Sequence, residues 1–348
     1  MKRVAIRPFG RYAAGWAEAF RAKGVDVLWV DPFSISSINS IKQCDAFFCS
    51  ISHDRPADLK FLSDLLDALE TSGYRVYPDR EMRRGFDDKV AQHWLFQTLK
   101  VKSPASWVFF DKAEAIKFVD SAVYPLVFKL ARGAGSQNVR LVAHRLEART
   151  LIDRMFTKGL KTYPPISQLS RAIEAKRSEG IRIKDTRRLI KGMSRLLSLS
   201  FSGRNREYGY VLFQEFVAEN KCDYRVTVIG ERAFVFMRGI RANDFRASGS
   251  GKLVYPEPED VDVELLKSAF EARDKLHSST IAMDFVRDRQ SGAYLLLEYS
   301  FSFIPDAVSD CAGFFDRNLS WNPVRKTAEY WIVADFIESF DSATPVHD

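Results

Sequence analysis

The sequence has few cysteines and no long apolar run. Four cysteines occur in 348 residues, and none of them forms a C-x-x-C pair or a cluster with histidine. We therefore expect neither a disulfide scaffold nor a structural zinc site. No apolar run approaches the roughly 20 residues that a membrane span needs. The first residues carry charges inside their apolar stretch and lack a small-residue cleavage site, so we expect no secretory signal and a cytoplasmic protein with reduced thiols.

The composition is that of a globular protein. Hydrophobic residues make up 46% of the chain and charged residues 28%, which excludes wholesale disorder. A chain of 348 residues holds two or three domains of about 100–200 residues each, and it can bury a sizeable core. The sequence contains no internal repeat and no low-complexity tract.

The net charge of +7 is concentrated in one part of the chain. Residues 151–206, which we call the basic segment, contain 14 lysines and arginines against 4 aspartates and glutamates, whereas the rest of the chain is slightly acidic. This local excess predicts an anionic partner at one face. A solvated pair of helices is the alternative. No RRM, zinc-finger or zipper pattern accompanies the segment, so we expect no nucleic-acid partner.

Strand and helix patterns alternate through the first 85 residues. Short apolar runs that end near proline or aspartate predict strands, and apolar residues at helical spacing predict helices. The expected strands cover residues 3–7, 25–30, 45–51 and 74–77, and the expected helices cover residues 12–23 and 57–71. Strands that alternate with helices favour a parallel sheet with helices on its faces.

The remainder of the chain changes to antiparallel patterns. Residues 124–130 and 139–143 predict a hairpin with a small-residue tip, and the basic segment is mostly helical in period. From residue 210 onward, β-rich runs bounded by turns predict antiparallel strands. Strands are expected at 107–110, 210–216, 223–229, 232–239, 282–287 and 293–299, and helices at 87–100, 112–121, 263–276 and 323–340.

Lys129 stands at the end of an expected strand and precedes a loop of glycine, alanine and serine. Backbone N–H groups in such a loop can approach phosphate oxygens closely, and a lysine beside it adds a positive charge. The sequence differs from G-x-x-x-x-G-K-[ST], which excludes a Walker P-loop. A hairpin with a flexible polar tip is the alternative.

A second group of residues surrounds the apolar strand at 213–217. The strand enters a short linker before residues 223–226 (DYRV), where its backbone can meet an adenine edge while a nearby carboxylate meets ribose hydroxyls. A core strand with a surface glutamate explains the same pattern.

A third group lies within residues 236–251, where three arginines precede a stretch rich in glycine and serine. Guanidinium groups suit an acyl phosphate or a transferring phosphoryl group. An exposed basic loop is the alternative.

A fourth group consists of Asp284 and Glu298, each in an apolar strand, and Ser300 on the same strand face as Glu298. Carboxylates rarely lie in such surroundings without a partner. Two of them facing one way suit magnesium, which takes oxygen ligands and keeps waters and substrate phosphates. A structural salt bridge is the alternative.

The order of these groups resembles the ATP-grasp superfamily, most closely its branch of ribosomal-protein glutamate ligases. The resemblance covers roughly residues 86–305 and rests on seven motifs that follow one another as in that family. They are Asp88-Lys89, residues 129–133 (KLARG), Gln214-Glu215-Phe216-Val217, Asp223-Tyr224-Arg225, residues 238–248 with Asp244-Phe245-Arg246, Asp284, and Glu298-Tyr299-Ser300.

This resemblance implies an α/β protein in three parts. An N-terminal open parallel α/β pre-ATP-grasp domain would cover residues 1–85. A two-lobed ATP-grasp fold with antiparallel sheets would follow, with its N-terminal lobe at 86–212 and its C-terminal lobe at 213–348. The basic segment would be a helical insertion in the N-terminal lobe. Dimers are common in the superfamily, so a homodimer is compatible with the resemblance.

The resemblance also implies a set of ATP contacts. Two lysines would hold the phosphates from two sides, and the loop at 133–138 would close over them. The adenine would meet mainly backbone groups of the strand end at 214–217, and a carboxylate would lie near the ribose, with Glu219 as the alternative to Asp223. The implied contacts are Lys89, Lys129, Gly133, Gly135, Ser136, Gln214, Glu215, Phe216, Val217 and Asp223.

Catalytic and metal-binding roles follow from the same resemblance. Arg238 and Arg246 would stabilise the phosphates and an acyl-phosphate intermediate. Asp284 and Glu298 would bind Mg²⁺, with Glu298 bridging two ions. The usual asparagine after the second carboxylate is Ser300 here, and its hydroxyl offers one shorter oxygen ligand.

The implied activity is an ATP- and Mg²⁺-dependent joining of a carboxylate to an amine. The carboxylate would form an acyl phosphate, and the amine would displace the phosphate. No covalent enzyme intermediate is needed, which accounts for the lack of a Ser/His/Asp or Cys/His set. A kinase acting on a hydroxyl and a nucleotide-binding regulator without turnover are the alternatives.

Two loops of the first domain are candidates for substrate contacts. Residues 7–11 (RPFGR) and 53–55 (HDR) follow expected strands, and loops at the carboxyl ends of parallel strands commonly line a ligand crevice. Plain turns explain the same residues.

Overall fold

The computed structural model describes residues 1–53, 55, 57–133, 138–161, 206–240, 245–246 and 252–342. The chain divides into two compact units. Unit 1 consists of Met1–Asp87, Ala91–Pro104 and Val217–Asp348, and unit 2 consists of Asp88–Val90 and Ala105–Phe216. The three functional parts expected from the sequence, with boundaries near residues 85 and 212, stay a prediction.

Unit 1 begins with a four-stranded parallel sheet in the order β2-β1-β3-β4. Three of its strands are mostly buried and apolar, as is usual for parallel strands covered on both faces, whereas the edge strand β2 is partly exposed. The strands are β1 (Arg3–Ile6), β2 (Asp26–Trp29), β3 (Ala46–Phe48) and β4 (Arg75–Tyr77), and the main helices between them are α1 (Ala13–Ala22), α2 (Ser37–Ile41) and α3 (Ser63–Thr71). The predicted parallel sheet with flanking helices is therefore confirmed.

The expected helix at 57–71 contains an irregularity at its start. Its first turn, Asp58–Leu62, is π-helical and leads directly into α3. Asp58 is fully buried in this turn, where its carboxylate accepts two hydrogen bonds from the Arg7 guanidinium, at 2.7 and 2.9 Å. π-Helical turns are rare and occur mostly as single turns within α-helices.

A larger antiparallel sheet forms the other half of unit 1, in the order β15-β14-β11-β12-β16-β17, with β13 paired to β12. Gly230, at a φ of +58°, makes the turn between β11 and β12. The strands are β11 (Cys222–Ile229), β12 (Arg232–Gly239), β13 (Leu253–Val254), β14 (Thr280–Arg287), β15 (Tyr294–Ser300), β16 (Phe314–Asp316) and β17 (Trp321–Asn322).

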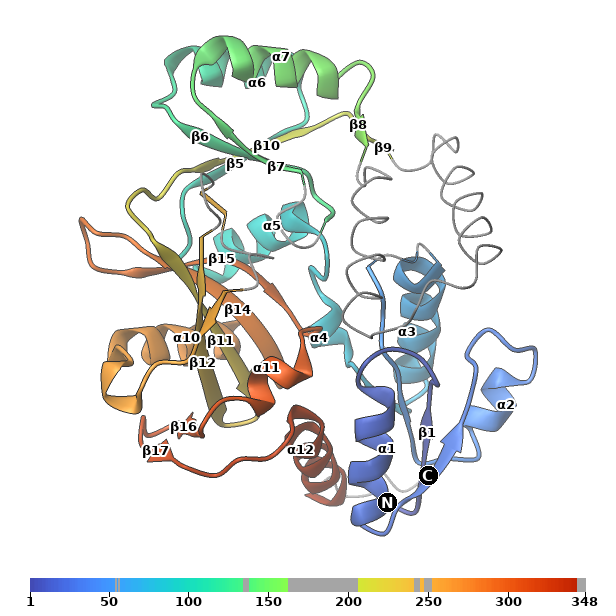
Figure 1. The fold of residues 1–348 in the computed structure, drawn as a ribbon. Coiled ribbons are helices and arrows are strands. Elements are labelled where there is room, and N and C mark those ends of the chain that lie inside the picture. Colours follow the sequence, from blue (N-terminus) through green and yellow to red (C-terminus); the bar gives the residue numbers. More distant parts are fainter. Residues whose placement is uncertain are drawn as a thin grey trace, which may run out of the picture. The chain divides into compact units, whose positions relative to one another are not determined.

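Helices cover this sheet and connect it to the rest of unit 1. Helix α10 (Val263–Lys275) packs its apolar side chains on the strands, and α12 (Ala328–Ser342) lies beside α1 (Figure 1). The last helix was expected from residue 323, but 323–327 are not helical. The remaining helices of unit 1 are α4 (Arg80–Arg83), α11 (Pro305–Ser309) and most of α5 (Lys89–Leu99).

Unit 2 is a four-stranded antiparallel sheet in the order β5-β10-β6-β7, and two helices cover one of its faces (Figure 1). The expected hairpin is confirmed, because β6 and β7 pair directly. The elements are β5 (Ser106–Phe109), α6 (Lys112–Ser121), β6 (Leu126–Lys129), β7 (Val139–Val142), α7 (Arg145–Met155) and β10 (Val211–Glu215). The expected strand at 210–216 thus belongs to this sheet.

A short ladder of β8 (Leu160–Lys161) and β9 (Arg206–Glu207) completes the described part of unit 2. Most of the basic segment, residues 162–205, lies outside the described residues. The parallel sheet followed by antiparallel sheets confirms the expected α/β class. In the described ranges, no helix combines the length and the apolar character that crossing a bilayer requires.

Candidate functional site

The residues expected to bind phosphates meet at one loop of unit 2. Lys129 ends β6 and is 7% exposed. Beyond it, the chain makes a turn in which Gly133 has a φ of +126°, a conformation that favours glycine. Lys89 reaches this turn from the start of α5: its ammonium group donates to the Gly133 carbonyl at 2.9 Å, and its backbone N–H donates to the Ala131 carbonyl at 2.9 Å.

Asp88 fixes the start of α5 and thereby Lys89. Its Oδ1 accepts a hydrogen bond from the backbone N–H of Val90 at 3.0 Å, which satisfies one of the free N–H groups at the helix start. The Asp-Lys pair noted in the sequence therefore has two separate tasks. The aspartate caps the start of the helix, and the lysine contacts the loop.

Strand β10 holds the residues expected at the adenine. The Gln214 side chain is buried and donates to Ser106 Oγ at 2.9 Å, so it serves the sheet. Glu215 is exposed, and Phe216 and Val217 are half-buried. An adenine contact through the backbone of these residues stays a prediction.

Unit 1 contains a buried network of two aspartates and two arginines on three neighbouring strands. Asp223 and Arg225 lie on β11, opposite Arg238 of β12 and Asp284 of β14 respectively. Arg238 donates to both oxygens of Asp223, at 2.7 and 2.6 Å, and its Nη2 lies 2.7 Å from Asp284 Oδ2. Arg225 forms a second fork on Asp284, through its Nε and through its Nη2 at 2.9 Å.

Burial and the arginines act on these two carboxyl groups in opposite ways. Burial raises the pKa of Asp223 to about 6, against the hydrogen bond from Arg238. Burial alone would also raise the pKa of Asp284, but the guanidinium groups of Arg225 and Arg238 outweigh it and hold that pKa below its ordinary value. Asp284 is therefore the more firmly ionised member of the pair.

Glu298 lies beside this network. It pairs with Asp284 in the β14–β15 ladder, next to a register irregularity after Asp284, and it is half-buried. Two residues further on, the Ser300 hydroxyl donates to the Ser302 carbonyl at 2.8 Å and accepts the Ser302 N–H at 3.0 Å. Ser300 thus closes a local turn at the end of β15.

Comparisons with known proteins support the fold of this chain. No protein-family model matches it. A curated relative, alpha-aminoadipate–LysW ligase LysX of Saccharolobus solfataricus, is 22% identical over 250 residues, which is 72% of this chain and 71% of the relative. A RimK domain ATP-grasp protein of Sphaerobacter thermophilus superposes with a TM-score of 0.55 at 15% identity, over 95% of this chain and 98% of the other.

This chain has the ATP-grasp fold. Two further solved structures agree: the ATP-grasp ligase PsnB with a minimal precursor (TM-score 0.53, 16% identity, 97% of this chain and 98% of the other) and biotin carboxylase of Campylobacter jejuni with an ATP analogue (TM-score 0.57, 14% identity, 90% and 68%). The resemblance and the fold class expected from the sequence are confirmed.

The carboxylates of Asp284 and Glu298 are suitable ligands for magnesium, but Asp284 is already bound by arginines. Asp284 and Glu298 supply oxygen ligands, and Mg²⁺ is commonly held by one or two carboxylates together with substrate phosphates. Within the described residues, no three Asp, Glu, His or Cys side chains form a metal cluster. Both oxygens of Asp284 already accept from arginines, so an ion there must displace one of these bonds. The salt-bridge alternative is therefore present, and the metal role stays a prediction.

Other expected residues are only partly described. Arg246 is half-buried, but its neighbours at 241–244 and 247–251 lie outside the described residues, as do Gly135 and Ser136. The roles expected for these three residues stay predictions.

The two loops considered for substrate contacts, residues 7–11 and 53–55, are also only partly described, and their residues differ in what they contact. Asp54 lies outside the described part of the chain. Arg7 is 3% exposed and bound to Asp58, which is a structural contact. Arg55 is exposed and stacks over Phe9, with 4.7 Å between its guanidinium carbon and the ring centroid, so it remains a candidate.

Two further residues, Arg225 of unit 1 and Glu207 of unit 2, have no role assigned from the sequence. The motif that contains Arg225 predicts no role for it, although period-two alternation places it on the same face of β11 as Asp223. Glu207 was not noted, because nothing local in the sequence links it to the loop after Lys129. Its carboxylate nevertheless accepts hydrogen bonds from two amides of that loop.

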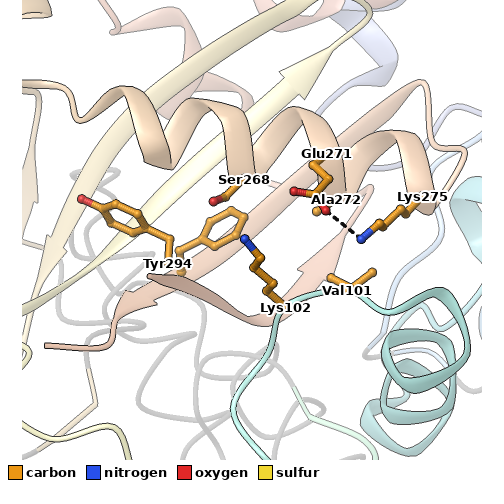
Figure 2. Close-up of a pocket in the computed structure, with 8 residues that line it drawn as sticks. Val101, Lys102, Ser268, Glu271, Ala272, Lys275 and Tyr294 are labelled. Carbon is orange, nitrogen blue, oxygen red and sulfur yellow. Dashed lines mark hydrogen bonds and ion pairs between the residues drawn. The ribbon is translucent and has the colours of Figure 1, made fainter. Parts of the chain in front are cut away.

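A small depression beside α10 is separate from these residues. Figure 2 shows it between the helix and Tyr294, with the ion pair between Glu271 and Lys275 on one side. It encloses about 10 Å³, room for about one water molecule, so it is far too small for a nucleotide.

Proposed function

We propose that this chain is an ATP-dependent ligase that activates a carboxylate as an acyl phosphate and joins it to an amine. The observation that carries the proposal is the meeting of Lys89 with the loop after Lys129 in an ATP-grasp fold. A buried lysine at the end of a strand, followed by a turn that contains glycine, suits the phosphates of ATP.

Each group receives one task in this proposal. Lys89 and Lys129 bind phosphates, and the backbone of residues 215–217 binds adenine. Glu219 is better suited to the ribose than Asp223, because its side chain is 73% exposed, whereas both oxygens of Asp223 are bound to Arg238. Magnesium, when bound, neutralises phosphate charge through Glu298 and Asp284.

The chemistry needs positioning more than reactive side chains. A carboxylate oxygen attacks the γ-phosphorus of ATP, ADP leaves, and a mixed anhydride forms. The amine then attacks the acyl carbon, inorganic phosphate leaves, and the amine loses a proton. Arg238 can offset the charge that develops on the transferring group, since its guanidinium is held in place by two carboxylates.

An anionic carboxylate substrate suits this chain. The basic segment has ten more basic than acidic residues. One similar protein, the ATP-grasp ligase PsnB, has been solved in a complex with a precursor peptide. We therefore propose that the carboxylate or the amine belongs to an acidic polypeptide or another anionic acceptor.

The experiment measures ADP release in the presence of Mg²⁺ and panels of acids and amines, followed by trapping with hydroxylamine. Release that requires an acid, together with a hydroxamate product, supports the ligase. A stable phosphorylated hydroxyl product without a hydroxamate would replace it with the kinase alternative.

Ser300 favours one other candidate, a nucleotide-binding regulator without turnover, because it replaces the usual asparagine ligand. Saturable binding of Mg·ATP without ADP release under any substrate pair would support this candidate. Detectable turnover with any pair would exclude it.

A further inference from the structure

The first residues after Lys129 are bound by a carboxylate on their amide side. We call residues 131–133 the loop root. The Ala131 N–H donates to Glu207 Oε2 at 2.9 Å, and the Arg132 N–H donates to Glu207 Oε1 at 3.1 Å. Two successive amides that point at one anion form a small anion-binding nest. Here the nest is filled by the chain's own carboxylate.

Tyr210 adds to this contact. Its hydroxyl donates to Glu207 Oε2 and accepts the Ala131 N–H at 2.6 Å. Charge-assisted hydrogen bonds of this kind are stronger than neutral ones. Glu207 and Tyr210 therefore hold the same amide of the loop root from two directions.

The carbonyl side of the loop root is bound by Lys89. Its backbone N–H donates to the Ala131 carbonyl and its ammonium group donates to the Gly133 carbonyl, both at 2.9 Å. The loop root is thus fixed by a glutamate and a tyrosine on its amides and by a lysine on its carbonyls. All of these residues belong to unit 2.

The backbone around Glu207 leaves it little freedom. Arg206 donates to the carbonyls of Lys158 and Gly159, at 2.9 and 3.1 Å. Gly159 has a φ of +65°, and a Cβ on it would lie 2.5 Å from the Glu207 carbonyl oxygen. The turn after α7 therefore packs directly on the backbone of β9 at Glu207.

We propose that Glu207, assisted by Tyr210, is a positioning residue that sets the loop root for the phosphates of ATP. The proposal rests on the proposed function, because it assigns a nucleotide to this loop. Glu207 acts through the backbone of Ala131 and Arg132, whose amides it occupies. Residues 131–133 are then held in one position before the nucleotide binds, and that lowers the ordering cost of binding.

The test compares three variants by calorimetry with Mg·AMP-PNP and by competition with adenosine. Glu207→Gln leaves one acceptor oxygen for two amides, and Tyr210→Phe removes the hydroxyl. Glu147→Gln is the matched control, since Glu147 Oε2 also accepts a backbone N–H, that of Ala143 at 3.0 Å, at the other end of β7.

We expect Glu207→Gln to weaken Mg·AMP-PNP binding roughly tenfold, since a hydrogen bond to a charged group is lost. Tyr210→Phe should weaken it by a smaller factor and Glu147→Gln not at all. Adenosine affinity should stay unchanged in all three, because the loop is assigned to phosphates. General destabilisation would weaken both ligands together.

The positioning role would be overturned if wild type, Glu207→Gln and Tyr210→Phe bound Mg·AMP-PNP with equal affinity. It would also be overturned if the variants lost affinity for adenosine to the same extent as for Mg·AMP-PNP. Tyr210→Phe keeps the test valid if Glu207→Gln does not fold. Absence of Mg·AMP-PNP binding by the wild type is a different result, since it contradicts the proposed function itself.

Discussion

Replacing Asp284 by asparagine should destabilise unit 1 strongly. Asp284 is 3% exposed and accepts hydrogen bonds from both Arg225 and Arg238. Asparagine keeps the shape but removes the charge and one acceptor, so Arg225 loses its carboxylate partner in a buried position. Arg238 keeps Asp223.

The expected magnitude follows from the burial of this network. Removing one partner of a buried ion pair costs about 3–5 kcal/mol. For a unit of about 150–250 residues, each kcal/mol moves the unfolding midpoint by about 2–4 °C. We therefore expect the midpoint of the Asp284→Asn variant to fall by roughly 6 °C or more at neutral pH.

The assay measures thermal unfolding by calorimetry, and Asp274→Asn is the matched control. Asp274 also pairs with an arginine, Arg317, but the two side chains are 38% and 46% exposed. Such surface pairs contribute about 0–1 kcal/mol. A midpoint for Asp284→Asn equal to that of Asp274→Asn would refute the buried network.

The destabilisation caused by Asp284→Asn depends on pH, and its direction follows from the pKa of Asp284. The guanidinium groups hold the pKa of Asp284 below its ordinary value despite burial. The stabilisation by Asp284 is therefore fully present above the pKa that this residue has in the unfolded chain. It is lost as the pH falls through the pKa of Asp284 in the folded chain. The difference in unfolding midpoint between the wild type and Asp284→Asn should become smaller at acidic pH.

Three further outcomes are expected. Lys129→Ala should abolish nucleotide-dependent turnover without unfolding the protein, with the exposed Lys117→Ala as control, and unchanged turnover would remove the phosphate assignment. Burial raises the pKa of Asp223 to about 6 in the folded chain, so its contribution to stability is lost as the pH rises from about 4 to 6. In the Asp223→Asn variant, the unfolding midpoint should therefore depend less on pH over that range. Gly159→Ala should cost about 1–2 kcal/mol or more in urea unfolding, since Gly159 has a φ of +65°; no loss would contradict the close packing on Glu207.

Local patterns in the sequence were sufficient for much of the fold. The hairpin around Lys129 was predictable because two β-rich runs flank a small-residue loop, and β6 and β7 do pair there. The parallel sheet followed from alternating strands and helices. The ion pair of Asp58 with Arg7, at the π-helical turn, was not predictable, since the two residues lie 51 positions apart.

The candidate site shows the same limit. Asp284 was identified as a buried carboxylate in need of a partner, and the sequence favoured magnesium over a salt bridge. Its arginine partner Arg225 is 59 residues away and is brought close by strand pairing alone. Glu207 meets Ala131 across 76 residues. Contacts of this kind depend on sheet register, which no local spacing reveals.

Titration of the purified chain with Mg·AMP-PNP, followed by calorimetry, tests the central claim most directly. A saturable heat for wild type that disappears in Lys129→Ala is the predicted result. No heat with the wild type, or the same heat with Lys129→Ala, would contradict the assignment of this ATP-grasp chain to ATP-dependent chemistry at that lysine.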